Sequence, residues 1–500
     1  MVTIEPTLFQ TILLPLSLVP LIYLSRHRSD LREGLSLIVA AATILSVFTL
    51  VPRVLGGETL VWSLWEVLPG LELSFRVDGL GMLFAIVASV LWFVTTIYSI
   101  GYMRGAHEHA QARYYGYFAL AVFCTLGVAF AGNLLTLYLF YELLSLSTYP
   151  LVTHHQDEEA RAAGRKYLKY IVGTSIGLVL PGMMIIHHVA GDLSFGDGPI
   201  LSDVASGDAP GWGLGLVLLM MVFGFAKSDM MPFHRWLPGA MVAPTPVSSL
   251  LHAVAVVKVG VFCVIRVFTD VFGVELASLL TFGPVRPVAI VQTVAGATIV
   301  ISSLIAWRQN ELKKRLAYST IGQLAYIVLG AALLAPLSIT GSALHIAMHA
   351  FGKITLFFCA GAIYVAVHKK NIGDMVGIGR RMPITMICFF IGTLSVIGLP
   401  PTGGIMSKLL LVQGTLEAGT IGFLLIYLIS SFLNCAYYLP IVYRAFFCRD
   451  EDSRWGGPAQ EPPRWCLVPP VVTAICCVLL FVFPDVFLGL AELFAMETFR

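Results

Sequence analysis

The chain has 500 residues, of which 57% are hydrophobic and only 12% charged, and its mean hydropathy is +0.85. Soluble domains carry about 25% charged residues, so this composition excludes an ordinary soluble enzyme. The net charge of +2 does not indicate a nucleic-acid partner. Apolar runs of roughly 20 residues, each long enough to cross a bilayer, predict an all-α polytopic membrane protein and exclude a barrel.

Hydropathy and turn signals predict about 14 transmembrane helices. The first run has no basic segment before it and no small-residue cleavage site, so we interpret it as a helix and not as a removable signal peptide. In chain order the predicted helices lie near residues 7–25, 33–55, 77–100, 113–131, 133–153, 165–190, 211–231, 246–269, 287–306, 312–334, 340–367, 383–415, 419–446 and 466–494.

Basic residues gather in alternate loops, which the positive-inside rule places in the cytoplasm. The intervening loops are short or acidic, and the even helix count puts both termini on the same, outer face. The acidic loop 191–210 has no Lys or Arg and contains Asp192, Asp197, Asp203 and Asp208. The basic loop residues are Arg26, Arg28, Arg32, Arg104, Arg113, Arg161, Arg165, Lys166, Lys169, Arg308, Lys313, Lys314, Arg315, Lys369, Lys370, Arg380, Arg381, Arg444, Arg449 and Arg454.

Two of the apolar stretches contain helix breakers, and each break has a lysine beside it. Stretch 221–247 contains four prolines, and stretch 396–408 contains the sequence Pro-Pro-Thr-Gly-Gly. Unwound backbone at membrane depth needs protein or water to satisfy its hydrogen bonds, and breaks at matching positions of two halves indicate a transport site built from inverted repeats. We therefore expect an N-terminal part, two inverted five-helix repeats and a loop with the last helix, at 1–112, 113–270, 271–446 and 447–500.

Several ionisable residues lie inside the predicted helices, where each costs at least ~2.5–3.5 kcal/mol on insertion scales. An ion pair between helices would explain any one of them, but the cations outnumber the acids, so pairing cannot neutralise most of them. Three of them, His345, His349 and Lys353, are spaced by four residues and so share one helix face. The set, which predicts proton transfer, comprises Glu142, Lys227, Lys258, Lys353, Lys408, His252, His345 and His349.

A buried lysine with a carboxylate partner can act as a proton-loading switch. Burial disfavours the charged lysine and a nearby carboxylate favours it, so movement of the partner would load or release the proton. We assign this role to Glu142 and Lys227, while Asp229 is an alternative partner of Lys227 that the sequence leaves open. Histidines titrate near 6.5 and suit a relay between lysines.

The chain has no recognisable cofactor motif. Its nine cysteines show no C-x-x-C spacing, and it has no G-x-G-x-x-G, Walker A or cluster motif. His154 and His155 precede an acidic loop segment, which we interpret as a solvated face rather than a metal site. We therefore expect no metal, no cofactor and no redox site in this chain.

Four motifs resemble, in the same order, those of the antiporter-like subunits shared by respiratory complex I, Mrp-type multisubunit cation/proton antiporters and membrane-bound hydrogenases. They are FYELLSLSTYPLV, AKSDMMPFHRWLPGAMVAPTPVSSLLHAVAVVKVGVF, HIAMHAFGKITLFF and GLPPTGGIMSK. The resemblance covers roughly residues 75–445 and is greatest to the D-type member of the Mrp antiporters. It implies fourteen helices, two inverted repeats and a prokaryotic-type inner membrane. It also implies that Glu142 and the four lysines match the family's essential residues, with the three histidines at relay positions.

The function implied is that of a proton-translocating subunit of a multisubunit Na+/proton antiporter, which makes the protein one component of a secondary transporter. The alternative is the same proton path in a complex I-like or hydrogenase-like complex, where a partner's electron transfer drives pumping. In both cases we expect other membrane subunits, lipid and protons as partners, with Na+ added in the antiporter, and no nucleic acid.

Overall fold

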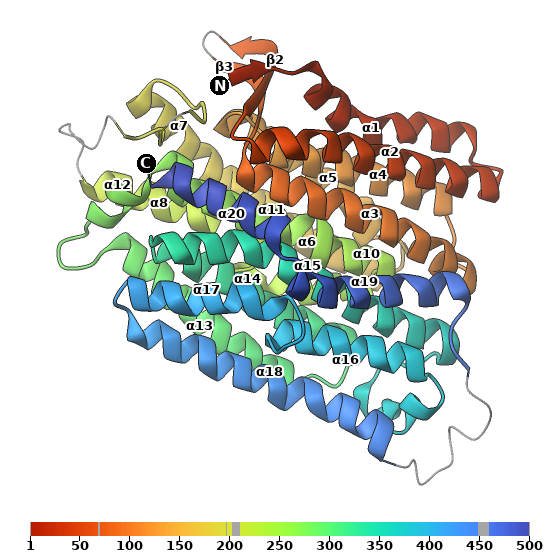
Figure 1. Cartoon of the computed structure of the whole chain (residues 1–500). Helices are drawn as coiled ribbons and strands as arrows, with labels where there is room; N and C mark the ends of the chain where they lie inside the picture. Colours follow the sequence, from red (N-terminus) through yellow and green to blue (C-terminus); the bar gives the residue numbers. More distant parts are fainter. Residues whose placement is uncertain (1, 69–70, 197, 203–210, 449–459, 500) are drawn as a thin grey trace.

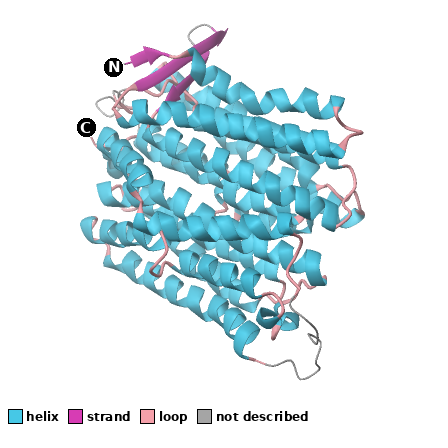
Figure 2. Cartoon of the chain, turned by 45° about the vertical axis from the view of Figure 1, so that its right-hand side comes forward, coloured by secondary structure: helices cyan, strands magenta, loops and turns pink. Residues whose placement is uncertain are grey.

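The computed structural model describes residues 2–68, 71–196, 198–202, 211–448 and 460–499. It shows a bundle of helices that run broadly along one direction, with a small sheet at one end (Figures 1 and 2). Both termini lie at the end that carries the sheet, as expected for an even number of crossings. Five residues of the predicted acidic and basic loops fall outside the described part of the chain, namely Asp197, Asp203, Asp208, Arg449 and Arg454.

The first five helices follow the predicted ranges closely. Side chains cap three of their starts, because Glu5 accepts a hydrogen bond from the backbone N–H of Thr7, Asp78 from that of Gly81, and Asn133 from that of Thr136. These caps satisfy N–H groups that the first helical turn leaves free. The five helices are α1 (Pro6–Leu24), α2 (Ser29–Leu55), α3 (Gly79–Gly105), α4 (Gln111–Ala129) and α5 (Leu134–Val152).

A three-stranded sheet, which we did not predict, precedes α3. Strand β2 (Thr59–Leu68) pairs in parallel with β1 (Val2–Ile4) and antiparallel with β3 (Leu71–Val77). The sequence TLVWSLWEVL is rich in branched and aromatic residues, which favour strands. A hydropathy window of about 19 residues is too wide to resolve strands of this length.

The middle of the chain contains helices that change geometry along their length. The predicted helix 165–190 begins earlier and includes a π-helical turn, and the predicted helix 246–269 includes two. The segments of the first are α6 (Glu158–Thr174), η1 (Ser175–Val179) and α7 (Leu180–Ala190). Those of the second are α10 (Thr245–Ser249), η6 (Leu250–Val254), α11 (Val256–Arg266) and η7 (Val267–Val271).

Both predicted breaks are present. Helix α8 (Gly211–Gly224) ends before a run of short turns, and α16 (Pro383–Ile397) is separated from α17 (Gly404–Glu417) by residues 398–403. Gly398 ends α16 with a left-handed backbone (φ 86°), and the prolines that follow α16 and α8 disfavour an uninterrupted helix through the two breaks. The turns after α8 are η3 (Ala226–Ser228), η4 (Phe233–Arg235), α9 (Trp236–Gly239) and η5 (Ala240–Val242).

The long helices of the second half match the prediction, but the last predicted helix, 466–494, is divided into two helices. Pro484 disfavours a helical backbone at Phe483, which has φ −128° and ψ 68°, so α19 ends there and α20 begins after it. The remaining elements are α12 (Val274–Leu279), α13 (Pro287–Arg308), α14 (Leu312–Ala332), α15 (Pro336–Val367), η8 (Ile372–Met375), η9 (Ile378–Arg380), α18 (Ile421–Phe447), α19 (Arg464–Val482) and α20 (Asp485–Thr498).

Helix α15 forms the centre of the bundle and packs against α3, α14, α16, α17, α19 and α20. Outer helices instead present large apolar side chains outward, including Leu24 on α1 and Phe432 on α18, which are 80% and 74% exposed. In the described part of the chain, nine helices are long and apolar enough to cross a membrane. The predicted all-α polytopic membrane fold of about 14 helices is therefore confirmed, with the small sheet as an addition.

Candidate functional site

The predicted lysines are buried inside the bundle. The side chains of Lys227, Lys258 and Lys353 are completely buried, and that of Lys408 is 7% exposed. His345 and His349 are also buried, whereas Glu142 is half-buried. His252 belongs to the π-helical turn η6, and its side chain lies outside the described part of the structure.

Lys258 and His349 are in direct contact at the centre of the bundle. The Nζ atom of Lys258, on α11, lies 2.7 Å from Nδ1 of His349, on α15. The ring of His349 stacks on that of His345, one helical turn earlier, with centroids 5.7 Å apart and planes at 17°. The three groups thus form a continuous row of titratable side chains, as the four-residue spacing predicted.

His345 continues the row toward the second helix break. Its Nδ1 atom lies 2.8 Å from Oγ of Ser407 on α17, and its Nε2 atom lies 3.1 Å from Oε1 of Gln323 on α14. Both ring nitrogens therefore have partners. The ring also stacks on Tyr326, with centroids 5.9 Å apart. These contacts fix the orientation of the imidazole and connect it to neutral groups that can pass a proton.

Lys408 lies at the break between α16 and α17. Its Nζ atom donates to the carbonyl oxygens of Val396 and Ile397, at 2.9 and 3.0 Å. These carbonyls belong to the last turn of α16, where no helical N–H follows to satisfy them and the helix dipole is negative. The same ammonium lies 4.8 Å from the centre of the Tyr326 ring. Among the residues that the structure describes, Lys408 is thus bound by backbone carbonyl oxygens and forms no ion pair.

Lys353 lies one turn beyond His349 on α15. Its Nζ atom donates to Oγ of Ser319 at 2.9 Å and to the hydroxyl of Tyr438 at 3.0 Å. It also reaches the carbonyl oxygen of Leu316 at 3.3 Å. All three partners are uncharged, so within the described structure Lys353 is solvated by polar groups and not by an ion pair.

Lys227 lies at the first break, on η3, and is held by the aromatic residue Tyr141. Its Nζ atom donates to the backbone carbonyl oxygen of Tyr141 and lies 3.4 Å from the centre of that ring. Glu142, the next residue on α5, is an electrostatic partner of Lys227 but makes no ion pair with it within 4.0 Å. The pair is therefore close but not in contact, as a separable partner requires.

Asp229, the alternative partner of Lys227, lies at the end of the same short turn η3. Its side chain is completely buried, and in the described structure neither carboxylate oxygen has a hydrogen-bond partner. In the described structure neither Asp229 nor Glu142 forms an ion pair with Lys227 within 4.0 Å, so the assignment of Glu142 as the partner stays a prediction.

Gly260 allows helix α11 to pack closely against η3, the short turn at the first break. A Cβ atom on Gly260 would lie 2.1 Å from the carbonyl carbon of Lys227, a distance that real atoms do not reach. Only glycine allows α11, which carries Lys258, to pack this closely on η3. The backbone segments of the two lysines are thus in contact, although their side chains have separate partners.

The sequence prediction missed the neutral members of the site. Four uncharged side chains contact the titratable residues, namely Gln323, Ser407, Tyr326 and Tyr438. The free-energy cost of inserting an uncharged side chain into a membrane is small, so these residues do not stand out in the sequence. Gln323, a polar residue within the apolar part of α14, was the one signal in the sequence that could have identified a member of this group. Only the fold shows that these side chains face the lysines and histidines.

The interpretation of the loop after α5 as a solvated face is wrong for His154. This side chain is completely buried, although it lies just beyond the membrane-spanning part of α5. Burial lowers the pKa of His154 to about 4, so its imidazole is neutral at physiological pH. A hydrogen bond to the carboxylate of Glu108 instead raises the pKa of the more exposed His155.

Comparison with known families gives two matches. The family described as "NADH:quinone oxidoreductase/Mrp antiporter, TM" matches residues 131–434, and "NADH-Ubiquinone oxidoreductase (complex I), chain 5 N-terminus" matches residues 69–115. The first match covers the ionisable row, and the second covers α3.

Similar proteins include components of both redox enzymes and antiporters. The N subunit of the NADH-quinone oxidoreductase of Desulforudis audaxviator is 33% identical over 429 residues, covering 83% of each chain. A probable K(+)/H(+) antiporter component of Rhizobium meliloti, of type A/B, is 30% identical, covering 92% of this chain and 46% of its own length. A Na(+)/H(+) antiporter component of Staphylococcus haemolyticus, of type A1, is 28% identical, covering 87% and 56%. The chain spans about half the length of these two antiporter proteins.

Two solved structures share the whole fold. A chain of the Mrp complex from Dietzia sp. DQ12-45-1b superposes with a TM-score of 0.83, at 20% identity, covering 98% of each chain. A chain of the membrane-bound sulfane sulfur reductase, an archaeal respiratory membrane complex, superposes with a TM-score of 0.84 at 22% identity, covering 99% of this chain and 98% of that one.

Proposed function

Because the chain belongs to the NADH:quinone oxidoreductase/Mrp antiporter family of membrane proteins, we propose that it is the proton-translocating subunit of a multisubunit monovalent cation/proton antiporter. Its partners are then other membrane subunits, protons and Na+. The similarity to proteins named as components of Na(+)/H(+) and K(+)/H(+) antiporters supports this choice of complex.

The observation that carries the proposal is the contact between Lys258 and His349. A lysine and an imidazole 2.7 Å apart can share one proton, and the stacked His345 extends the exchange toward Lys408. Neutral imidazole accepts a proton from an ammonium on one side and releases another on the opposite side. No hydrogen bond joins His349 to His345 in the described structure, so proton transfer between these two rings requires a bridging water molecule or a rotation of the rings.

Lys227 and Glu142 supply the switch at the other end of the row. When Glu142 approaches, the ammonium of Lys227 is favoured, and when it withdraws the buried lysine releases its proton. A conformational change elsewhere in the complex needs to move Glu142 by only a few ångströms. The absence of an ion pair within 4.0 Å, in the described structure, is compatible with the withdrawn state.

The arrangement in the membrane follows from the same proposal. Residues 113–270 and 271–446 form two inverted repeats, in which Lys227 and Lys408 occupy matching breaks. The protein lies in a prokaryotic-type inner membrane with both termini on the outer face. The loops at the opposite end of the bundle, which carry most of the basic residues, then face the cytoplasm.

The second candidate is a proton-pumping subunit of a redox-driven complex. Two observations favour it, namely the 33% identity to a component of a NADH-quinone oxidoreductase and the fold shared with the sulfane sulfur reductase. The ionisable row would serve that function equally well. Electron transfer in a partner protein would then move Glu142.

The experiment that separates the two candidates measures proton flux in everted vesicles that contain the whole complex. A respiratory substrate first acidifies the lumen, and a pH-sensitive dye then reports proton release after addition of NaCl, KCl or choline chloride. The antiporter predicts dequenching with Na+ or K+ but not with choline. If no cation releases protons and only an electron donor drives acidification, the antiporter proposal is wrong and the redox complex is supported.

A further inference from the structure

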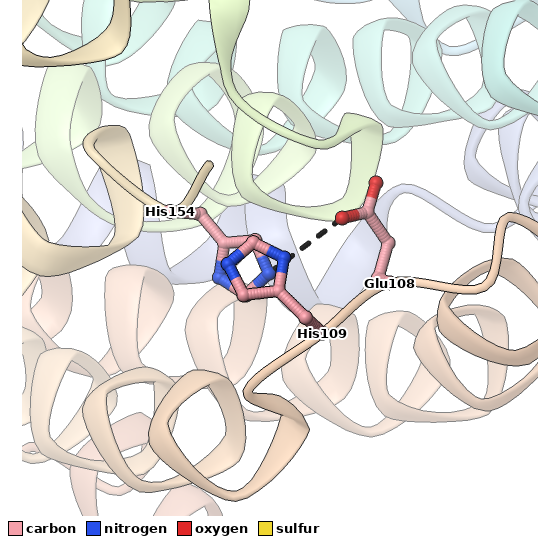
Figure 3. Close-up of side chains that lie close together, drawn as sticks. All are labelled: Glu108, His109 and His154. Carbon is pink, nitrogen blue, oxygen red and sulfur yellow. Dashed lines mark ion pairs between the residues drawn. The ribbon is translucent and has the colours of Figure 1, made fainter. Parts of the chain in front are cut away.

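The loops after α3 and α5 bring together a group of side chains that the ionisable row does not use. Glu108 and His109 follow α3, and His154 follows α5. Their ligand atoms, one from each residue, all lie within 4.8 Å of one another. Figure 3 shows the two imidazoles facing the carboxylate. We propose that Glu108, His109 and His154 bind a divalent transition-metal ion of the Zn2+ class.

The first support is an unsatisfied buried imidazole. His154 is completely buried, and in the described structure neither of its ring nitrogens has a hydrogen-bond partner. Leaving a buried polar group unpaired costs about 1–3 kcal/mol. The carboxylate of Glu108 lies beside the ring, with Oε2 3.7 Å from Nε2 of His154. A metal ion between these atoms would satisfy both.

The distances fit such an ion. A tetrahedral Zn2+ with bonds of about 2.0–2.1 Å holds its ligand atoms roughly 3.3 Å apart. The separation of 3.7 Å between His154 and Glu108 is within a few tenths of an ångström of that value. The rings of His109 and His154 have centroids 4.9 Å apart, and a rotation of the exposed His109 would bring its nitrogen closer.

The donor set selects the class of ion. Two neutral imidazoles and one carboxylate match borderline ions such as Zn2+, whereas Mg2+ and Ca2+ prefer oxygen ligands only. His155 is a fourth candidate ligand, because its Nε2 atom lies 3.3 Å from Glu108. Water or His155 would complete the tetrahedron.

The surroundings position two of the ligands. Arg113 donates a hydrogen bond of 2.7 Å to the backbone carbonyl oxygen of His154, and Gln111 donates one of 3.2 Å to that of Glu108. Glu108 and His155 also line a pocket of about 380 Å3 that contains Lys313. A bound ion would tie the two loops together at the rim of this pocket, on the end of the bundle that we place in the cytoplasm.

The test is metal binding by the purified whole complex, stripped with a chelator and titrated with Zn2+ by calorimetry. Co2+ absorption in the visible range reports whether the ion is tetrahedral. Glu108→Gln and His109→Ala alter partly exposed side chains and so preserve folding, and His154→Ala is added as a third variant. His107→Ala, an exposed histidine beside the group, is the matched control.

We expect one ion per complex to be lost or bound at least about tenfold more weakly in each ligand variant, since even outer-shell changes cost 10–100-fold in affinity. The control should bind as the wild type does, and Mg2+ should not compete. Equal Zn2+ binding by the wild type and the Glu108→Gln and His109→Ala variants would overturn the proposal, as would the absence of any bound Zn2+ in the wild type. Neither outcome depends on the direction or driving force of proton transport.

Discussion

Replacement of Glu142 by glutamine removes the negative charge that we propose acts on Lys227, with little change in the shape of the side chain. The ammonium of Lys227 would keep its contact with the carbonyl oxygen and ring of Tyr141, but would lose its electrostatic partner. The protonated state of this buried lysine therefore becomes less favourable.

The structure sets the size of the effect. Two unit charges 4 Å apart interact by about 4 kcal/mol at an effective dielectric constant of 20, and Glu142 and Lys227 are farther apart than 4.0 Å. Glu142 is also half-buried, so solvent screens part of the interaction. We expect a loss of roughly 1–2 kcal/mol, which makes the protonated lysine about 5- to 30-fold rarer at a pH where it is partly loaded.

The assay is a pH series of dye-monitored proton flux in everted vesicles. The Glu142→Gln variant should transport about 5- to 30-fold more slowly near neutral pH, in proportion to the loaded lysine. Its optimum should shift to lower pH, where protons still load the lysine. Glu142→Asp keeps the charge one methylene farther away and should retain part of the activity. Glu492→Gln, an exposed glutamate on α20, is the matched control.

The reasoning would be refuted by a Glu142→Gln variant that keeps the wild-type rate and pH optimum. Immunoblots and native gels must first show that each variant inserts and assembles. If the variant then behaved as the wild type does, Glu142 would be structural and Asp229 would become the better candidate for the partner of Lys227.

Four further predictions concern the row and its packing. Lys408→Ala should abolish transport while the complex still assembles, and near-normal flux in vesicles would remove the second break from the path. Lys227→Arg should also fail in the flux assay, because a guanidinium cannot release its proton, and substantial activity would contradict a loading role. His349→Ala should slow transport far more than His368→Ala, a change outside the row, and equal rates would end the relay argument. Gly260→Ala should lower the thermal stability of the complex, because its Cβ would overlap the backbone of Lys227, and an unchanged melting temperature would contradict that packing.

The sequence was sufficient to predict the helices and the identity of the charged residues. Glu142 and the lysines stand out because their insertion cost is large against an apolar background. The two breaks were also predictable, since prolines and glycines leave little choice of backbone. The family was identified from four motifs in order, and its match over residues 131–434 confirms it. The particular resemblance to the D-type Mrp protein stays a prediction.

Other features depend on tertiary packing, which a single sequence does not reveal. The contact between Lys258 and His349 joins residues 91 positions apart on two helices. The choice between Glu142 and Asp229 stays open, because in the described structure neither carboxylate forms an ion pair with Lys227. The burial of His154 was also unpredictable, since its loop sequence is polar and the residues that lie against it come from the loop after α3 and from α4.

The most direct test of the central claim is the proton flux of a Lys258→Met variant. Methionine fills much of the same space but carries no proton, so it interrupts the contact with His349 while preserving the packing. Stopped-flow measurement with a pH-sensitive dye in proteoliposomes of the whole complex should show flux below about a tenth of the wild-type rate, because a positioned group contributes ~100-fold or more to proton transfer. Flux equal to that of the wild type would contradict a path through the buried lysines and histidines.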